Sequence, residues 1–358
     1  MILTARTDRP HQAFVAFDRH GHELVVVVVK STYAIQPDAS LVAAEQQVPV
    51  FAADQFNGEP ALSSVRYESD LIPPKPGIDL LVNGTAYSAK PTRDLQVELQ
   101  TRHFRKTVQV IGDRVWVDGP AGLRPSAARS FHAMPITYER AFGGVSRADG
   151  VVTDAELRNP VGIGFASKSP RDGTPLPNIE DPAALISQGS DHPSPTGFSA
   201  IAKGWEPRIR YAGTYDAEWR ETRFPLVPGD FQERFFLCAP ASQVMRELAT
   251  DEPVLLRNLT PSGQLRIEVP AVRVPVVFRW DRHAVRQDAE PDTMIVEPDE
   301  RRVIVVTRTA AFLGQRRDAL KEVIVGELNR AEERAILLRK RYAPLNQLPA
   351  NGAGGDAL

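Results

Sequence analysis

Cysteine is almost absent from this chain of 358 residues, in which Cys238 is the only one. A single cysteine excludes an internal disulfide framework. Cys238 lies in the apolar run of residues 235–239, which predicts a buried thiol. Because a reactive thiolate needs an accessible and electropositive setting, we expect no catalytic cysteine here.

Long hydrophobic runs and a large net charge are also missing. The longest apolar run, residues 24–29, is far shorter than the roughly 20 residues of a membrane-spanning helix, so we expect no membrane insertion. The formal net charge of −2 gives no general electrostatic reason to bind nucleic acid. The first residues lack the charged-then-apolar pattern of a signal peptide, so we expect a cytoplasmic protein.

Motifs of known catalytic and cofactor sites are missing as well. The sequence has no Gly-x-Ser-x-Gly elbow, Walker loop, dinucleotide fingerprint or His-Glu-x-x-His. His20 and His22 flank a turn glycine without any recognised zinc spacing, which favours polar turn surface over half of a metal site. Gly162 and Gly164 precede no helical pattern, so a phosphate-binding loop is not favoured. We expect no cofactor, no metal and no catalytic residue.

Strand patterns dominate both ends of the chain. Residues 14–33 predict a hairpin, in which five consecutive valines, 25–29, predict a strand covered on both faces. Residues 95–99 and 108–117 alternate apolar and polar side chains, as half-buried antiparallel strands do, with Gly112-Asp113 as a predicted tight turn. Towards the C-terminus we expect a short helix at 241–248 and strands at 230–239, 272–280, 293–296, 303–309 and 322–325.

One longer helix is predicted near the C-terminus. Asn329 followed by Glu332 resembles a capping box at its start, and Pro344 ends it. The glycine-rich residues 346–358 are predicted to be a flexible tail. The apolar positions that recur at spacings of three and four are Leu328, Ala331, Ala335, Leu338 and Tyr342.

The middle of the chain is rich in residues that resist regular structure. Residues 120–230 contain 13 prolines and 12 glycines, but they also contain ten Phe, Tyr and Trp side chains. Because disordered segments are poor in aromatic residues, we expect ordered loops packed on β-sheet. At their centre, residues 134–144 read Met-Pro-Ile-Thr-Tyr-Glu-Arg-Ala-Phe-Gly-Gly, where the paired glycines indicate tight backbone geometry.

These patterns predict a mainly β fold. We expect two antiparallel β lobes, sandwich-like or barrel-like, bridged by the ordered Gly/Pro-rich loop region, with few short helices besides the C-terminal one. The predicted parts are an N-terminal lobe at 1–119, the loop region at 120–230, a C-terminal lobe at 231–345 and the tail at 346–358.

Charged and aromatic residues of the loop region are the candidate functional residues. They are expected either to latch loops through buried hydrogen bonds or to form a face that binds a partner. An alternative is a carbohydrate or peptidoglycan hydrolase, in which Glu139 pairs with Asp216 or Asp230 as acid and base. The candidates are Tyr138, Glu139, Arg140, Phe142, Gly143, Gly144, Trp205, Tyr215, Asp216, Trp219 and Arg223.

Positive charge gathers in residues 301–341, where 11 Lys/Arg stand against 5 Asp/Glu, a local charge of +6. This pattern is typical of a solvated basic face. The other interpretation is a docking patch for an acidic partner.

Motifs spread over residues 24–270 resemble the bacterial family labelled domain of unknown function 2169, a group of type VI secretion accessory proteins. Residues 134–144 carry the resemblance, together with Asn159-Pro-x-Gly-x-Gly-Phe165, Leu176-Pro-Asn-Ile-Glu180 and Ala212-Gly-Thr-Tyr-Asp-x-x-Trp219. Lys30-Ser-Thr-Tyr33, Pro74-Lys-Pro-Gly77 with Asp79, and Asn258-Leu-Thr-Pro-x-Gly263 add to it.

The resemblance implies a non-enzymatic adaptor or chaperone. Its protein partner would be a toxic effector, or a spike component of the VgrG or PAAR type, and its role would be to help load the effector on the spike. Such an adaptor is expected in the cytoplasm and can be carried with the secretion apparatus. A component of the spike assembly itself is a further alternative.

Overall fold

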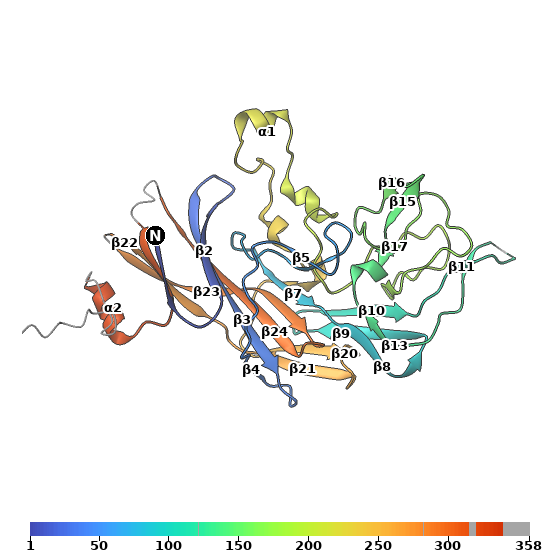
Figure 1. The fold of residues 1–358 in the computed structure, drawn as a ribbon, viewed down its shortest axis with the longest axis horizontal. Helices are drawn as coiled ribbons and strands as arrows, with labels where there is room; N and C mark the ends of the chain where they lie inside the picture. Colours follow the sequence, from blue (N-terminus) through green and yellow to red (C-terminus); the bar gives the residue numbers. More distant parts are fainter. Residues whose placement is uncertain (121, 282, 315–319, 339–358) are drawn as a thin grey trace, which may run out of the picture.

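A computed structural model describes residues 1–120, 122–281, 283–314 and 320–338. The predicted mainly β fold with few short helices is confirmed, and two large sheets make up most of it (Figure 1). None of the helices in these residues is long and apolar enough to span a membrane.

The larger sheet has ten strands in the path β1-β25-β22-β23-β24-β3-β2, with β4 beside β3, β7 beside β23 and β19 beside β7. Adjacent strands within this sheet run antiparallel, except for the parallel pairs β1 with β25 and β7 with β23. Its strands are β1 (Ile2–Arg6), β2 (His11–Phe17), β3 (Glu23–Ile35), β4 (Leu41–Ala43), β7 (Ile78–Val82), β19 (Val244–Met245), β22 (Val274–Trp280), β23 (Ala284–Glu297), β24 (Arg302–Phe312) and β25 (Leu320–Gly326).

The five valines lie in β3, and all of them are fully buried, as predicted. Val25, Val27 and Val29 pack with residues of β22 and β25, which are three and four strands away along the sheet path. The sheet must therefore curl until its two ends face each other. Val28 points to the other face, where it packs with loop residues such as Val48 and Cys238. Both faces of this strand are covered because the sheet is curled on one side and overlaid by loops on the other.

The second sheet has five strands and packs face to face on part of the first. Its order is β18-β10-β9-β20-β21. Leu99 and Leu256 of this sheet share one buried cluster with Leu80 and Val305 of the larger sheet, which forms the main core. The strands are β9 (Asp94–Gln100), β10 (Arg105–Ile111), β18 (Ile179–Glu180), β20 (Glu252–Arg257) and β21 (Gln264–Val269).

Strands from both ends of the chain alternate within each sheet. The N-terminal β3 lies beside the C-terminal β24, and β9 lies beside β20. The predicted boundaries at 119/120 and 230/231 therefore do not separate the two sheets. The alternation of apolar residues specifies a buried face but not the neighbouring strand.

The remaining strands form short two-stranded ribbons, and the helices are short. The ribbons are β5 (Gln55–Phe56) with β6 (Val65–Tyr67), β8 (Thr85–Thr92) with β13 (Phe131–Pro135), β11 (Trp116–Val117) with β12 (Arg124–Pro125), β14 (Phe142–Gly143) with β17 (Ile163–Gly164) and β15 (Val145–Ala148) with β16 (Val151–Ala155). The helices are α1 (Ala217–Thr222), α2 (Arg330–Leu337) and the 3-10 helices η1 (Tyr138–Arg140), η2 (Arg208–Ala212), η3 (Glu233–Phe236) and η4 (Ala241–Gln243).

Three local predictions were wrong. Residues 230–239 contain the 3-10 helix η3 instead of a strand, and the helix predicted at 241–248 is only the 3-10 helix η4, which strand β19 follows. Gly112-Asp113 does not join two paired strands, because β11 pairs with β12 and not with β10. Gly112 serves another purpose: a Cβ there would lie 1.8 Å from the backbone oxygen of Arg129.

The capping box of α2 is confirmed. The Asn329 side chain accepts from the Glu332 backbone N–H at 3.0 Å, and the Glu332 carboxylate accepts from the Asn329 N–H at 3.0 Å. The predicted helix residue Tyr342, the stop at Pro344 and the tail 346–358 lie outside the described residues.

Candidate functional site

The loop region is tied together by the buried side chain of Asn159. Its amide nitrogen donates to the backbone oxygens of Tyr138 at 2.7 Å and Phe142 at 3.0 Å. Its backbone oxygen accepts from Gly144 N at 2.8 Å. One fully buried residue therefore fixes the loop of residues 134–144 against the loop of residues 159–165. This is the ordered loop structure that the sequence predicts, in which side-chain amides replace a regular ladder.

The paired glycines are required where these two loops meet. Gly143 and Gly144 have φ angles of +152° and +112°, which glycine adopts more readily than other residues. A Cβ at Gly143 would lie 2.1 Å from the backbone oxygen of Asn159. The two sequence candidates are thus explained by close approach of the backbone.

The Asn178 side chain fixes the loops to the second sheet through hydrogen bonds to backbone and side-chain groups. Its side-chain nitrogen donates to Ile111 O and to the Asp113 carboxylate, both at 3.0 Å, while its side-chain oxygen accepts from Arg140 Nη1 at 3.1 Å. Its backbone nitrogen donates to Arg140 O at 2.8 Å. Arg140 is thereby held over the end of β10.

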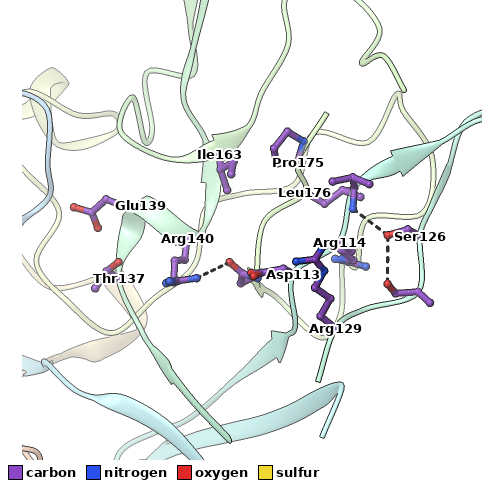
Figure 2. Close-up of a pocket in the computed structure, with 13 residues that line it drawn as sticks. Asp113, Arg114, Ser126, Arg129, Thr137, Glu139, Arg140, Ile163, Pro175 and Leu176 are labelled. Carbon is purple, nitrogen blue, oxygen red and sulfur yellow. Dashed lines mark hydrogen bonds between the residues drawn. The ribbon is translucent and has the colours of Figure 1, made fainter. Parts of the chain in front are cut away.

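A cavity of about 610 Å³ opens beside η1, at the edge of these loops. Figure 2 shows Arg140 and Glu139 on the η1 side, with the Glu139 carboxylate turned away from the other lining side chains, and Arg114, Arg129 and Ser126 on the opposite side. Its lining comprises Asp113, Arg114, Val115, Ser126, Ala127, Arg129, Thr137, Glu139, Arg140, Ile163, Pro175, Leu176 and Asn178.

The acidic groups of the cavity already have donors. The Glu139 carboxylate accepts from the Ser64 backbone N–H at 2.6 Å and from the Ser64 hydroxyl at 3.0 Å. These two hydrogen bonds connect η1 to the residue that precedes strand β6. Glu180, just outside the lining, is ion-paired with Arg114 and accepts from Ile186 N at 2.8 Å. Burial raises the pKa of the Glu180 carboxyl, and the Arg114 guanidinium opposes that rise.

Three of the predicted aromatic candidates are core residues. Tyr138 packs edge-on against Trp205 at 5.4 Å between ring centroids, and both are buried in the main core. Phe142 is buried in a small cluster with Trp116 and Leu176, behind the cavity. All three are buried, so these candidates pack inside the protein and do not form part of its exposed surface.

A second candidate site is the aromatic arm, which we define as residues 213–230. Figure 1 shows its helix α1 standing away from both sheets. Tyr215 and Phe224 are 53% and 67% exposed, and each packs edge-on against the half-buried Trp219, at 4.7 and 5.7 Å between ring centroids. The arm thus presents a cluster of aromatic rings to solvent, which is unusual for side chains of this size.

Hydrogen bonds hold the arm in one shape. The Asp230 carboxylate closes its base by accepting from Thr214 N at 3.0 Å and from the Thr214 hydroxyl at 2.8 Å. These bonds lower the pKa of the Asp230 carboxyl, and the backbone bond is the largest cause. Asp216 caps α1 by accepting from Trp219 N at 2.9 Å.

Two further side chains, Trp219 and Arg223, fix the arm through three hydrogen bonds. Trp219 Nε1 donates to Leu226 O at 2.8 Å. Arg223 donates to Val227 O at 3.0 Å and, across the molecule, to Arg19 O in the β2–β3 turn at 3.1 Å. Arg223 therefore latches the arm to the curled sheet.

The proposed acid–base pair is not brought together in one site. Glu139 lines the cavity, whereas Asp216 and Asp230 belong to the arm and do not line it. The Glu139 carboxylate accepts from Ser64, whereas the Asp216 and Asp230 carboxylates accept from Trp219 and Thr214 of the arm. The three carboxylates therefore do not share one cavity lining.

Cys238 is buried, as predicted, in a polar cluster beneath the curled sheet. Asp79 accepts from Cys238 N and Ala239 N, both at 3.0 Å, and pairs with Lys75 at 2.7 Å. Burial, followed by the Asp79 charge, raises the pKa of the Cys238 thiol well above its usual value. The motif residues Lys75 and Asp79 thus fasten a loop rather than activate the thiol.

His20 and His22 lie at the exposed β2–β3 turn, where His22 Nδ1 meets the Asp18 carboxylate at 2.8 Å. Within the part of the chain that the structure describes, no group of three His, Cys, Asp or Glu side chains could hold a metal ion.

The basic segment 301–341 is partly neutralised inside the protein. Arg302 pairs with the buried Glu297 at 2.6 Å, and the buried Arg308 pairs with Asp292. Arg301 donates to Ile35 O. Arg302 and Arg308 are therefore neutralised by carboxylates, whereas Arg301 is exposed and has no carboxylate partner among the described residues.

Sequence reasoning missed several residues of both sites. Phe224 carries the most exposed ring of the arm, yet in the sequence it is only one aromatic among many. Arg114 and Arg129 stand in no motif with Arg140, and only the folded chain brings them to one cavity. Asn159 and Asn178 stand in the quoted motifs, but those motifs give no signal of the side-chain hydrogen bonds found.

A family model described as "Uncharacterized protein conserved in bacteria (DUF2169)" matches residues 20–308. The chain belongs to this family. The match to the family includes the cavity, the aromatic arm and most strands of both sheets, and it extends beyond residue 270, where the quoted motifs end. No curated protein and no solved structure is similar enough to the chain to count as a match.

Proposed function

We propose that this protein is a non-enzymatic adaptor that binds another polypeptide through the aromatic arm. The observation that carries the proposal is the pair of exposed rings, Tyr215 and Phe224, on a segment that hydrogen bonds hold rigid. Aromatic side chains are enriched among the residues that dominate binding energy at protein interfaces. A rigid segment also loses little conformational freedom when it binds.

The available surface is large enough to matter. A buried aromatic side chain contributes about 150–250 Å². The exposed parts of Tyr215 and Phe224 therefore offer on the order of 200 Å² together. At about 25 cal/mol per Å², covering this surface is worth up to about 5 kcal/mol before the costs of association.

The partner we propose is a type VI secretion effector, or the spike component that receives it. Support comes from the motif resemblance, which the family match widens to residues 20–308. In this role the arm would contact an apolar groove on the effector, and the protein would act before secretion. A permanent component of the spike would bind the spike protein and not the effector.

The test is co-purification of the wild-type chain with the effector and the spike protein encoded beside it. We expect Tyr215→Ala and Phe224→Ala each to weaken binding about 10- to 100-fold, as residues central to an interface do. Leu62→Ala is the matched control, because Leu62 is 65% exposed and lies outside the arm. Binding of neither protein by the wild type would refute the secretion role. Unchanged binding by both arm variants would refute the arm as the site.

A further inference from the structure

The cavity beside η1 contains cationic groups that no carboxylate neutralises. Its lining holds three arginines, Arg114, Arg129 and Arg140. Only Arg114 has an ion pair, with Glu180. Arg140 donates to the neutral side chain of Asn178, and its other guanidinium N–H groups have no acceptor among the described residues. Arg129 is exposed, and its guanidinium has no hydrogen-bond partner in the same part of the chain.

The two acids of the lining do not offset these charges directly. The Glu139 carboxylate is occupied by the Ser64 N–H and hydroxyl, and Asp113 accepts from the Asn178 amide. Neither acid lies within ion-pair distance of an arginine of the described chain. Figure 2 shows the Arg114 and Arg129 side chains converging near Asp113, with Arg140 approaching from the other side.

A buried donor at the cavity wall is also unsatisfied. The Arg114 side chain is only 9% exposed, and its Nε–H has no hydrogen-bond acceptor in the described chain. Buried polar groups of this kind are normally paired. Because this Nε atom is closed to solvent, it does not itself face a ligand in the cavity, and Arg129 and Arg140 are the arginines left to bind one.

The rest of the lining favours one class of anion. Ile163, Pro175 and Leu176 give one wall an apolar surface, next to the guanidinium groups. A hydrated inorganic anion gains nothing from such a wall. A carboxylate attached to a short carbon chain fits both parts, because guanidinium groups bind carboxylates through paired hydrogen bonds.

We propose that this cavity binds a carboxylate of a partner polypeptide, either an Asp or Glu side chain or a chain terminus, between Arg129 and Arg140. The inference rests on the proposed function, since the adaptor role supplies the polypeptide. The loop bearing Arg140 is fixed by Asn159 and Asn178, and the Arg129 backbone N–H donates to Asp113 O at 2.9 Å, so the backbone of the site is in place before the ligand arrives. The cavity then binds an acidic residue of the partner, while the arm makes apolar contacts with the same partner.

The experiment is calorimetric titration of the full chain at low salt with short capped peptides. The first probe, acetyl-Gly-Glu-Gly-amide, carries a side-chain carboxylate, and the second, acetyl-Gly-Gly-Gly, carries a terminal one. Acetyl-Gly-Gln-Gly-amide and inorganic phosphate are the comparison ligands. We expect at least one carboxylate peptide to bind about tenfold or more tightly than the Gln peptide, since a charged hydrogen-bond pair is worth that much.

Variants locate the binding. Arg129→Gln should weaken the carboxylate peptide about tenfold, and because Arg129 is exposed, the variant is expected to fold. Arg124→Gln is the matched control: Arg124 is an exposed arginine of the neighbouring strand β12, outside the lining. Arg140→Gln is a second test, with thermal melting to check that loss of its bond to Asn178 leaves the fold intact.

These experiments distinguish a failure of the cavity inference from a failure of the proposed arm interface. Equal affinity for the Glu and Gln peptides, or unchanged affinity in Arg129→Gln, would overturn the inference. Phosphate binding as tightly as the carboxylate peptides would overturn it too, in favour of a phosphate site. Phe224→Ala should leave peptide binding unchanged. Partner capture that depends on the arm, without any peptide binding, would contradict the cavity inference alone.

Discussion

Replacing Asn159 by alanine is the most direct test of how the loop region is held. The side chain is fully buried, and its amide donates to the backbone oxygens of Tyr138 and Phe142. The substitution takes the side-chain donor from the Phe142 oxygen and leaves the Tyr138 oxygen with only the bond from the Ala141 backbone N–H at 3.1 Å. An unpaired buried polar group costs about 1–3 kcal/mol and a lost hydrogen bond about 1 kcal/mol, so we expect a loss of about 2–4 kcal/mol in the free energy of unfolding. That loss is a large share of the roughly 5–15 kcal/mol of a typical domain.

The assay is urea unfolding followed by tryptophan fluorescence, because Trp205 and Trp116 are buried on either side of these loops. We expect a lower midpoint concentration with an unchanged slope. Gln188→Ala is the control, since Gln188 is exposed and is expected to change stability by less than about 0.5 kcal/mol. A midpoint for Asn159→Ala no lower than that of the control would refute the role assigned to this side chain.

The isosteric variant Asn159→Asp separates charge from shape. Its carboxylate would face the two backbone oxygens that the amide now serves, which raises the pKa of that carboxyl in the folded state. A pKa raised on folding means that the folded state binds more protons at neutral pH. The variant should therefore be least stable near pH 7 and recover as the pH falls towards 5. No recovery on acidification would contradict this account.

Other substitutions test the glycine pair and the buried charges. Gly143→Ala, whose Cβ would meet a backbone oxygen at 2.1 Å, should lower the melting temperature far more than Gly150→Ala, which also has a positive φ but open space around it. Asp79→Ala, read out by urea unfolding, should cost about 3–5 kcal/mol, because the buried Lys75 ammonium loses its counter-charge. Burial lowers the pKa of Lys106 to about 7, below its usual 10.5, so the unfolded chain binds more protons between these values. Stability should gain up to about 1.4 kcal/mol per pH unit between pH 7 and 10.5, and lose this gain in Lys106→Met.

The strands were predictable because their side-chain pattern is local. Five β-branched residues in a row favour an extended chain, and residues 25–29 do form the centre of the longest buried stretch in β3. Their neighbours were not predictable in the same way. Val27 pairs with Thr309 and Ala13, and nothing in a run of valines distinguishes a partner near in sequence from one near the other end.

The aromatic candidates show that the sequence does not predict which individual side chains are buried. Trp205 and Tyr215 lie ten residues apart in the same loop-rich segment, yet one is in the main core and the other is exposed. From residue type alone, the same degree of burial is expected for both side chains. Burial depends on the direction of the loop, which is set by distant bonds such as that from Arg223 to Arg19 O. Phe224 escaped notice for this reason.

Glycine in particular has two uses that a sequence does not separate. Gly112 was interpreted as half of a hairpin turn, but it is needed because the backbone of Arg129 approaches to within a distance that no Cβ allows. That same approach brings Arg129 to the cavity wall. The feature misread as a turn is therefore part of what assembles the cationic site.

The two proposed sites depend on one structural principle. A loop without a hydrogen-bonded ladder must satisfy its buried backbone groups by other means, and here side chains such as Asn159, Asn178 and Asp230 do so. Each such bond removes freedom from the unbound loop, so less conformational entropy remains to be lost on binding. Asp230→Ala opens the base of the arm but removes no aromatic ring. We therefore expect this variant to bind the partner more weakly, mainly because the entropy of binding becomes less favourable. Were affinity to depend only on the exposed rings, that variant would bind like the wild type.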